Sequence, residues 1–214
     1  MNRLVKTNLV TEEGYRLCIK SLHLLLTSTA HILPVKTFEK AVDIVTEITK
    51  RSAMTDSLQY CSECILMLTE LDTCKDPGCV SKIIECVPKH LMNSEDTFTQ
   101  YNSFFICGNI FFRRLCNNPI ELVNLLQQFI KYGIMVKDPN SIIGLPFAMA
   151  KLSSEKKLFS ILKEENLLMK ALDLCLSILD KKPSKVSVVS NEYMPPQYIF
   201  YSCCGVGYAS YIVG

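Results

Sequence analysis

The sequence of 214 residues contains little of what marks several common classes of protein. Only 8 glycines and 9 prolines are present, and most of them stand between apolar segments. The formal net charge is +2, which is too small to indicate nucleic acid or an acidic membrane as a partner. No apolar run of roughly 18 residues occurs, which argues against a membrane span. Because 49% of the residues are hydrophobic and 21% charged, the composition indicates a folded protein.

Motifs for nucleotide, nucleophile and metal chemistry are also missing from the sequence. No Walker A sequence, GxSxG or HExxH occurs. The Gly205-Val206-Gly207 segment lacks the third glycine and the strand–turn–helix context of a dinucleotide site. We therefore assign no catalytic, cofactor-binding or metal-binding residues, expect no cofactor, and predict that the protein is not an enzyme.

Cysteine is abundant, with 11 residues, an odd number that leaves at least one of them unpaired. The opening sequence MNRLVKTNLV lacks the continuous apolar stretch and small-residue cleavage site of a secretory signal. We therefore expect an intracellular protein, in the cytoplasm or nucleus, with mostly free thiols. Most cysteines fall on apolar faces of the expected helices, where a thiol behaves as a small hydrophobic side chain.

A helix-capping residue is followed by proline at three places: Asp76-Pro77, Asn118-Pro119 and Asp138-Pro139. The Asp or Asn oxygen can accept from the first free N–H groups of a helix, and proline fits the first helical position. Each pair precedes apolar residues at helical spacing. With other capping residues, these pairs predict helix starts near residues 11, 37, 55, 76, 94, 118, 138 and 154. A ninth helix is expected over about 166–180.

Other capping and breaking residues set the expected ends of these helices. Thr37 is predicted to cap the second helix and Ser94 to open the fifth. Pro88 predicts an end or a kink in the fourth helix, because proline removes a backbone donor. Gly133 is placed as the left-handed C-terminal cap of the sixth.

The expected fifth helix carries an unusually aromatic sequence. Phe98, Phe105 and Phe112 recur at a spacing of seven and are predicted to form its inward face. Phe104 and Phe111 are expected to pack on adjacent helices. The cluster is interpreted as hydrophobic core rather than as a base-stacking surface for single-stranded nucleic acid.

Taken alternately, the helix starts recur about every 36 to 44 residues, the period of HEAT and armadillo helix pairs. The chain therefore resembles an armadillo/HEAT-type α-solenoid over about residues 11–180, and the stretch from Leu158 to Leu179 looks most like a repeat consensus. The resemblance implies an all-α fold, a right-handed stack of antiparallel helix pairs with about eight or nine helices. A regular helix-breaking glycine at each repeat start is missing, and an irregular helical bundle is the alternative architecture.

Two regions are expected along the chain. Residues 1–180 are predicted to form the α-helical repeat domain. Residues 181–214 begin with a basic linker containing Pro183, and Pro195-Pro196 forbids a helix through that point. The final apolar segment is predicted to be an irregular tail, and its abrupt end suggests a truncated element.

The resemblance implies a non-enzymatic scaffold or adaptor for protein–protein interaction within a larger protein or complex. Stacked helices expose a long concave surface, and such a groove usually holds a peptide or a partner helix. Asn102, Asn109 and Arg113 share one face of the expected fifth helix. These three residues are the predicted protein-binding residues.

The alternative function is a cysteine-rich metal-binding protein or a Cys/His-dependent enzyme. Cys61 and Cys64 form a CxxC pair and, with Cys74 and Cys79, could supply four thiolates to zinc. Against zinc, the pair falls within a helical stripe and lacks a glycine-containing tight turn. A catalytic Cys–His pair stays open as part of this alternative, because such partners meet in space rather than in sequence. The histidines are His23, His31 and His90.

Overall fold

The computed structural model describes residues 11–29, 33–71, 73–74, 76–113, 115–135, 169–170 and 173. Asp138-Pro139, the expected helices beyond it, the boundary at residue 180 and the 181–214 tail lie outside the described residues. The prediction of eight or nine helices and of two regions can therefore be compared with the structure only up to Met135.

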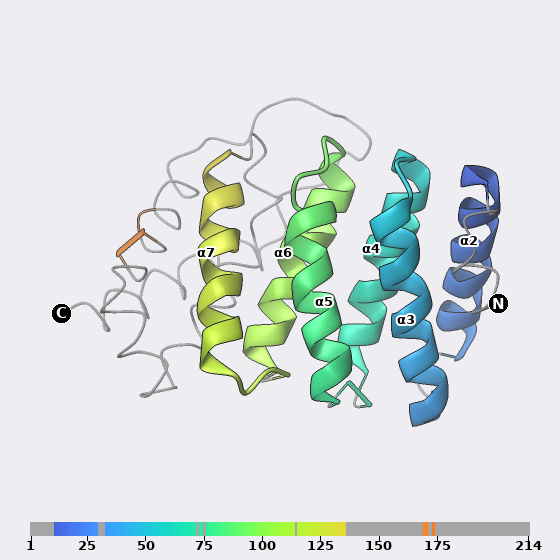
Figure 1. The fold of residues 1–214 in the computed structure, drawn as a ribbon, viewed down its shortest axis with the longest axis horizontal. Helices are drawn as coiled ribbons and strands as arrows, with labels where there is room; N and C mark the ends of the chain where they lie inside the picture. Colours follow the sequence, from blue (N-terminus) through green and yellow to red (C-terminus); the bar gives the residue numbers. More distant parts are fainter. Residues whose placement is uncertain are drawn as a thin grey trace, which may run out of the picture.

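The described chain contains six helices and, within those residues, no strand, so the predicted all-α class is confirmed there. Their labels follow Figure 1. The helices are α2 (Glu12–Thr29), α3 (Val35–Arg51), α4 (Thr55–Glu70), α5 (Pro77–His90), α6 (Thr97–Phe112) and α7 (Pro119–Met135).

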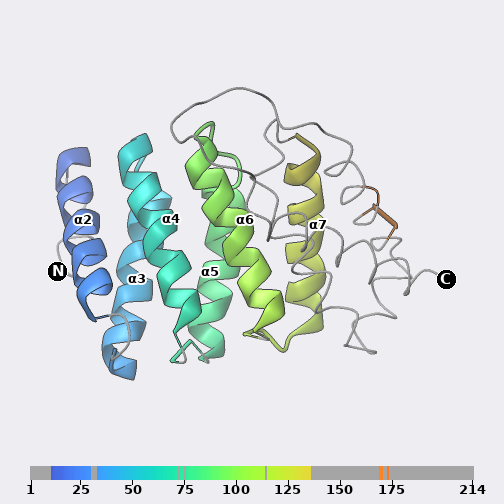
Figure 2. The same ribbon diagram turned by 180° about the vertical axis from the view of Figure 1, so that it is seen from behind.

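The helices form two layers. A first layer contains α2, α4 and α6, with α4 packed between the other two, and a second contains α3, α5 and α7, with α5 in the middle. Figure 1 shows the second layer in front, and Figure 2 shows α4 and α6 from the opposite side. Successive helices of one layer begin 42 or 43 residues apart, at Glu12, Thr55 and Thr97 and at Val35, Pro77 and Pro119.

Two side-chain hydrogen bonds between buried residues of the first layer span the same sequence separation. The Asn102 side-chain amide donates to Ser62 Oγ at 3.0 Å, across a separation of 40 residues. Asn109 donates to Thr69 Oγ1 at 3.4 Å, again 40 residues away. Because both bonds join α6 to α4 at the same offset, the two helices pack in a fixed register along this face.

The second layer repeats this register on two other pairs of helices, α3–α5 and α5–α7. Lys82 on α5 donates to Asp43 on α3 at 2.6 Å, with a separation of 39 residues. Ser81 donates to Glu121 of α7 at 3.0 Å, with a separation of 40. The α3–α5 and α5–α7 contacts therefore have nearly the same offset as the α4–α6 contact.

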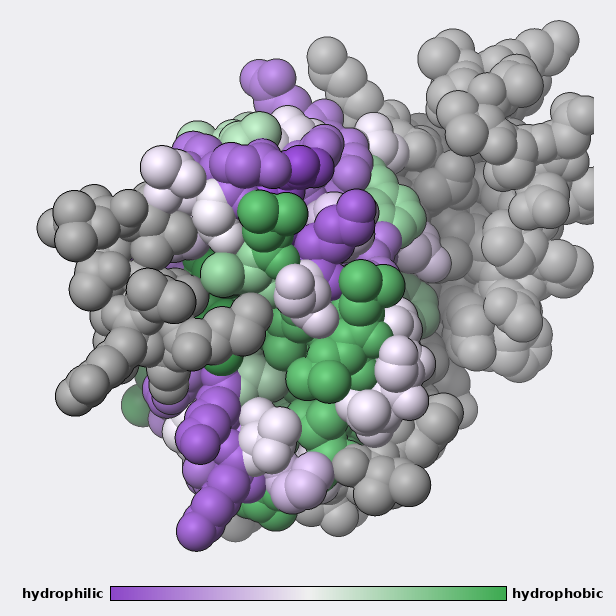
Figure 3. All heavy atoms as spheres, turned by 90° about the vertical axis from the view of Figure 1, so that its right-hand side faces the viewer, coloured by the Kyte–Doolittle hydropathy of each residue, from purple (hydrophilic) through white to green (hydrophobic). Residues whose placement is uncertain are grey.

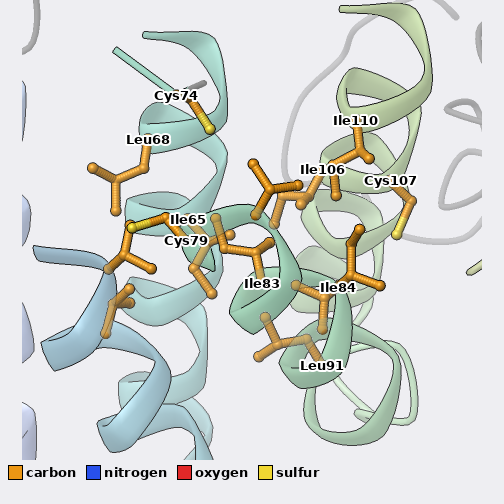
Figure 4. Packing of buried hydrophobic residues seen from close by; sticks show 14 of the residues in the cluster. Ile65, Leu68, Cys74, Cys79, Ile83, Ile84, Leu91, Ile106, Cys107 and Ile110 are labelled. Carbon is orange, nitrogen blue, oxygen red and sulfur yellow. The ribbon is translucent and has the colours of Figure 1, made fainter. Parts of the chain in front are cut away.

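Apolar side chains fill the space between the layers. Figure 4 shows side chains of α4, α5 and α6 meeting there, including Ile65, Ile83 and Ile106, none of which has exposed surface. Phe104 of α6 lies edge-on to Phe129 of α7, with 4.8 Å between the ring centroids. Burial of this apolar surface is the main force that holds the array together.

The structure corrects the expected position of Phe98 on α6, whereas Phe104 packs on the adjacent helix α7 as predicted. Phe104 and Phe111 are buried, with 0% and 4% exposure, whereas Phe98 is 47% exposed. Phe105 is partly buried against the core, and the side chain of Phe112 is outside the described residues. The prediction that Phe98 belongs to the inward face is wrong. Both aromatic series recur every seven residues, so periodicity alone could not choose between them.

Two of the three predicted Asp/Asn–Pro caps lie in the described chain, and both are confirmed. Asp76 accepts from the Cys79 N–H at 2.7 Å, and Pro77 is the first residue of α5. Asn118 accepts from the Ile120 N–H at 3.1 Å, directly before α7. These bonds satisfy backbone donors that a helix start would otherwise leave free.

Two predicted helix starts, those of α3 and α6, are displaced by a few residues. Thr37 lies inside the first turn of α3, because its N–H already bonds the carbonyl of Pro34 at 2.9 Å, and Pro34 is the N-cap. Asp96 caps α6 in place of Ser94, by accepting from the Thr99 N–H at 2.7 Å. Ser94 instead accepts from the Asp96 N–H at 3.2 Å and so supports the cap from outside the helix.

One predicted helix end is also displaced, and for α5 the structure excludes one of the two predicted alternatives, an end at Pro88. Helix α7 continues through Gly133 to Met135, and Gly133 is buried rather than acting as a C-terminal cap. Pro88 does not end α5, which continues to His90. Leu91 and Met92 both donate to the Val87 carbonyl, at 3.0 and 3.1 Å, so the carbonyl just before the proline is satisfied.

We expect the Asp96→Ala substitution to lower the free energy of unfolding by about 1–2 kcal/mol, because it removes the α6 cap. It also removes a 3.0 Å bond from the Gln59 side chain of α4. The matched control is Ser94→Ala, which leaves the Asp96 cap in place and should cost less. Urea denaturation measures both, and an equal or larger effect of Ser94→Ala would contradict the assigned cap.

Candidate functional site

The face of α6 that carries the predicted protein-binding residues is turned toward α4. Asn102 and Asn109 are 3% and 5% exposed, and their side chains bond Ser62 and Thr69 of α4. Burial of a side-chain amide is tolerated when it is hydrogen-bonded, and each of these bonds pairs one N–H of its asparagine. Asn102 and Asn109 therefore contribute to the contact between α4 and α6.

Arg113 follows the last residue of α6 and also reaches α4. Its guanidinium donates to the Thr69 carbonyl oxygen at 2.8 Å. That carbonyl belongs to the last turn of α4, where carbonyl groups lack helical partners and a cation is favourable. The structure thus brings the three predicted residues together along one helix contact; their binding of a partner protein stays a prediction.

Seven of the eight described free cysteines are buried, and Cys18 is partly exposed. Burial raises the pKa of Cys61 from 9.0 to about 12 and that of Cys86 to about 11. Burial also raises the pKa of Cys64 well above its usual value. Because the thiolate is both the nucleophile and the metal ligand, this environment disfavours either use of these buried thiols.

The four cysteines of the alternative zinc site are all described and buried. Across the described part of the chain, no group of three or more His, Cys, Asp or Glu side chains is placed to hold a metal ion. Cys79 bonds with Asp76 at the start of α5, and burial, followed by this bond, raises its pKa to about 12. The described geometry therefore gives no support to a four-thiolate site.

Two of the three histidines, His23 and His90, lie in the described residues, and each is close to charged side chains of its neighbours. His23 Nε2 of α2 lies 2.6 Å from Glu63 Oε2 of α4, and its ring packs against Tyr60 at 5.3 Å. Burial, together with nearby Lys50 and Lys89, lowers the pKa of His90. His31 lies outside the described residues.

A groove between α5 and α7, the α5–α7 groove, is a cavity that the described residues form on the second layer. Its volume is about 520 Å³. The floor is apolar, formed by Ile84, Pro88 and Leu125, and polar side chains follow both rims. The α5 rim contains Ser81, Glu85 and Lys89, and the α7 rim contains Glu121, Asn124 and Gln128.

Helix periodicity explains this division between floor and rims. On α5 the polar residues recur every four positions, and on α7 they recur at intervals of three and four, so each set lines one helix edge. The floor residue Leu125 is 1% exposed and Ile84 is 9% exposed. The groove therefore offers a narrow apolar strip between two rows of hydrogen-bonding groups.

The charged side chains of the α5–α7 groove form hydrogen bonds or ion pairs with neighbouring side chains. Glu121 accepts from Ser81 Oγ and from the Asn118 side-chain amide, each at 3.0 Å. Glu85 lies 3.5 Å from Lys89 and 3.8 Å from Lys50. These last pairs are solvent-exposed and are worth little to stability, so a ligand could replace them at low cost.

Pro88 gives the floor a backbone feature that an ordinary helix lacks. A proline has no N–H, so the carbonyl of Ile84, four residues earlier, loses its usual helical donor. Both residues line the groove. Amide side chains that can both donate and accept stand opposite, at Asn124 and Gln128. The groove can thus pair with both donors and acceptors of a bound chain.

Comparison with known proteins identified no relative: no family model, curated protein or solved structure matches the sequence. No helix in the described part of the chain is both long enough and apolar enough to cross a membrane.

Proposed function

We propose that the chain is an armadillo/HEAT-like α-solenoid that acts as a non-enzymatic scaffold for protein–protein interaction. In this proposal the α5–α7 groove binds an extended segment of a partner protein. The groove itself is the observation that carries the proposal, because it combines an apolar floor with polar rims along two parallel helix edges. Concave sites of this composition are where proteins usually bind ligands.

The repeated register supports the solenoid part of the proposal. Corresponding helices begin 42 or 43 residues apart, and polar contacts separated by 39 or 40 residues recur in both layers. In a solenoid each helix pair buries its apolar face against the next pair, and a constant offset between neighbours is the expected result. The predicted right-handed course of the stack belongs to the same proposal.

The chemistry of the groove defines the occupant. Ile84, Pro88 and Leu125 favour an apolar side chain on the partner, because a polar group placed against them would lose its hydrogen bonds to water without gaining new ones. Asn124 and Gln128 suit the N–H and C=O groups of an extended backbone, which a helical partner would keep for itself. We therefore expect a peptide with a bulky apolar residue flanked by polar ones.

Selection of a displayed random-peptide library on the purified full chain tests this function. We expect enriched peptides to share one bulky apolar position and to bind the chain in calorimetry. Gln128→Arg should weaken their binding about tenfold or more, because an arginine would project a desolvated charge over the apolar floor. The measurement is the dissociation constant of one enriched peptide.

The neighbouring Gln127 provides a matched control. It has the same side chain on the same helix but lies outside the groove lining, so Gln127→Arg should leave the dissociation constant unchanged. Equal loss of binding in both variants, or no enrichment of any peptide, would contradict the proposed site.

A further inference from the structure

The outer side of α2 exposes large apolar residues at the end of the first layer. Leu17 is 54% exposed and Leu24 is 59% exposed. They lie on the helix side opposite Ile19 and Leu22, which are buried in the core. Figure 3, which looks at this end of the array, shows hydrophobic surface bordered by hydrophilic residues. This surface therefore differs from the scattered apolar residues that are normal on a protein.

The helix periodicity shows what this side of α2 corresponds to in the rest of the layer. Asn102 and Asn109 lie as far from the start of α6 as Leu17 and Leu24 lie from the start of α2. On α6 those positions contact the preceding helix of the layer, α4. Leu17 and Leu24 thus occupy helix-contact positions, yet both remain exposed.

A stripe of four residues, the outer stripe of α2, runs along this side: Leu17, Ser21, Leu24 and Ser28. Large and small side chains alternate along the stripe, and Lys20, three residues from Leu17 and four from Leu24, borders it on one side. Ser21 Oγ donates to the Leu17 carbonyl and Ser28 Oγ to the Leu24 carbonyl, each at 2.8 Å. The hydroxyl donors are therefore already satisfied, and the stripe can be buried without new polar partners.

The order of these side chains is self-complementary. When two such helices pack antiparallel about a two-fold axis between Ser21 and Leu24, each leucine faces a serine of the other helix. Leu17 then faces Ser28, and Leu24 faces Ser21. Alternating large and small side chains let facing helices interdigitate closely, and a two-fold contact requires the same patch on both subunits.

We propose that the outer stripe of α2 is an interaction surface for a second copy of this chain, paired antiparallel through a two-fold axis. A single helix-on-helix contact belongs to the small class of specific interfaces, so we expect a weak dimer whose population depends on concentration. The surface is separate from the α5–α7 groove, and either site can exist without the other.

Sedimentation equilibrium of the full 214-residue chain over a range of concentrations tests the dimer. Leu24→Glu should raise the dissociation constant at least about 100-fold, since two buried leucines per dimer are replaced by charges. The matched control is Ile120→Glu, which changes a 70% exposed residue on α7 and should leave the dimer intact. A chain that stays monomeric at all concentrations, or equal effects of the two variants, would overturn the proposal.

Two further variants test the alternation of leucine and serine itself. Ser21→Leu places leucine against leucine at the axis and should weaken the dimer about tenfold through overpacking. Adding Leu24→Ser restores a leucine facing a serine, so the double variant should recover most of the affinity. If the dimer formed through a general apolar patch, Ser21→Leu would instead increase its affinity. That result would overturn the antiparallel geometry.

Discussion

Replacing Phe104 with alanine is expected to lower the free energy of unfolding by about 3–5 kcal/mol. The Phe104 ring has no exposed surface and lies edge-on to Phe129 of α7 at 4.8 Å. Its removal would leave a cavity where α6 contacts α7, and the surrounding helices could collapse only partly into it. Guanidinium denaturation measures the change.

Phe98→Ala is the matched control for this prediction. Phe98 is on the same helix but is 47% exposed, so its loss should cost much less than the loss of Phe104. A double-mutant cycle with Phe129→Ala should also show a coupling of about 0.5–1.5 kcal/mol from the ring pair. If Phe98→Ala proved as costly as Phe104→Ala, Phe104 would not be the inward-facing residue of α6.

The free energy of unfolding should fall steeply between pH 9 and about pH 11, because cysteine thiols are buried in their neutral form. Burial raises the pKa of Cys61 from 9.0 to about 12. Above pH 9 the unfolded chain loses this proton while the folded chain keeps it, so rising pH favours unfolding. Each such thiol contributes about 1.4 kcal/mol per pH unit in this window, and the effect is absent below pH 9.

Cys61→Ala isolates the contribution of one thiol from those of other alkaline groups. The variant will be less stable at pH 8 because of its cavity, but its stability should fall by about 1.4 kcal/mol less per pH unit above pH 9. Cys18→Ala is the control, since that thiol is partly exposed. Identical slopes for wild type and Cys61→Ala would show that Cys61 does not have the raised pKa.

The sequence predicted where the helices lie better than which residues they bury. The caps at Asp76 and Asn118 were predictable because Asp or Asn followed by proline acts locally. The orientation of α6 was not, because Phe98 and Phe104 belong to two aromatic series with the same period. Only contact with α4 and α7 decides between them, and that information is tertiary.

The α5–α7 groove was missed for a related reason. Its rims are visible in the sequence as polar residues at helical spacing, for example Ser81 with Glu85 and Asn124 with Gln128. Such stripes are usually solvated helix faces, and nothing local says that two of them flank an apolar strip. The packing of α5 beside α7 brings the two rims together, and Ser81 and Glu121, 40 residues apart, are hydrogen-bonded across it.

A photoreactive residue on the groove rim tests the central claim, that a partner segment binds between α5 and α7, most directly. One variant would carry the photoreactive residue at position 128 and a second variant would carry it at position 127. Each variant would be irradiated in the presence of an enriched peptide. We expect cross-linking to the peptide from position 128 and little from position 127, because only Gln128 lines the groove. Cross-linking from 127 alone, or from neither position despite measurable binding, would contradict the claim.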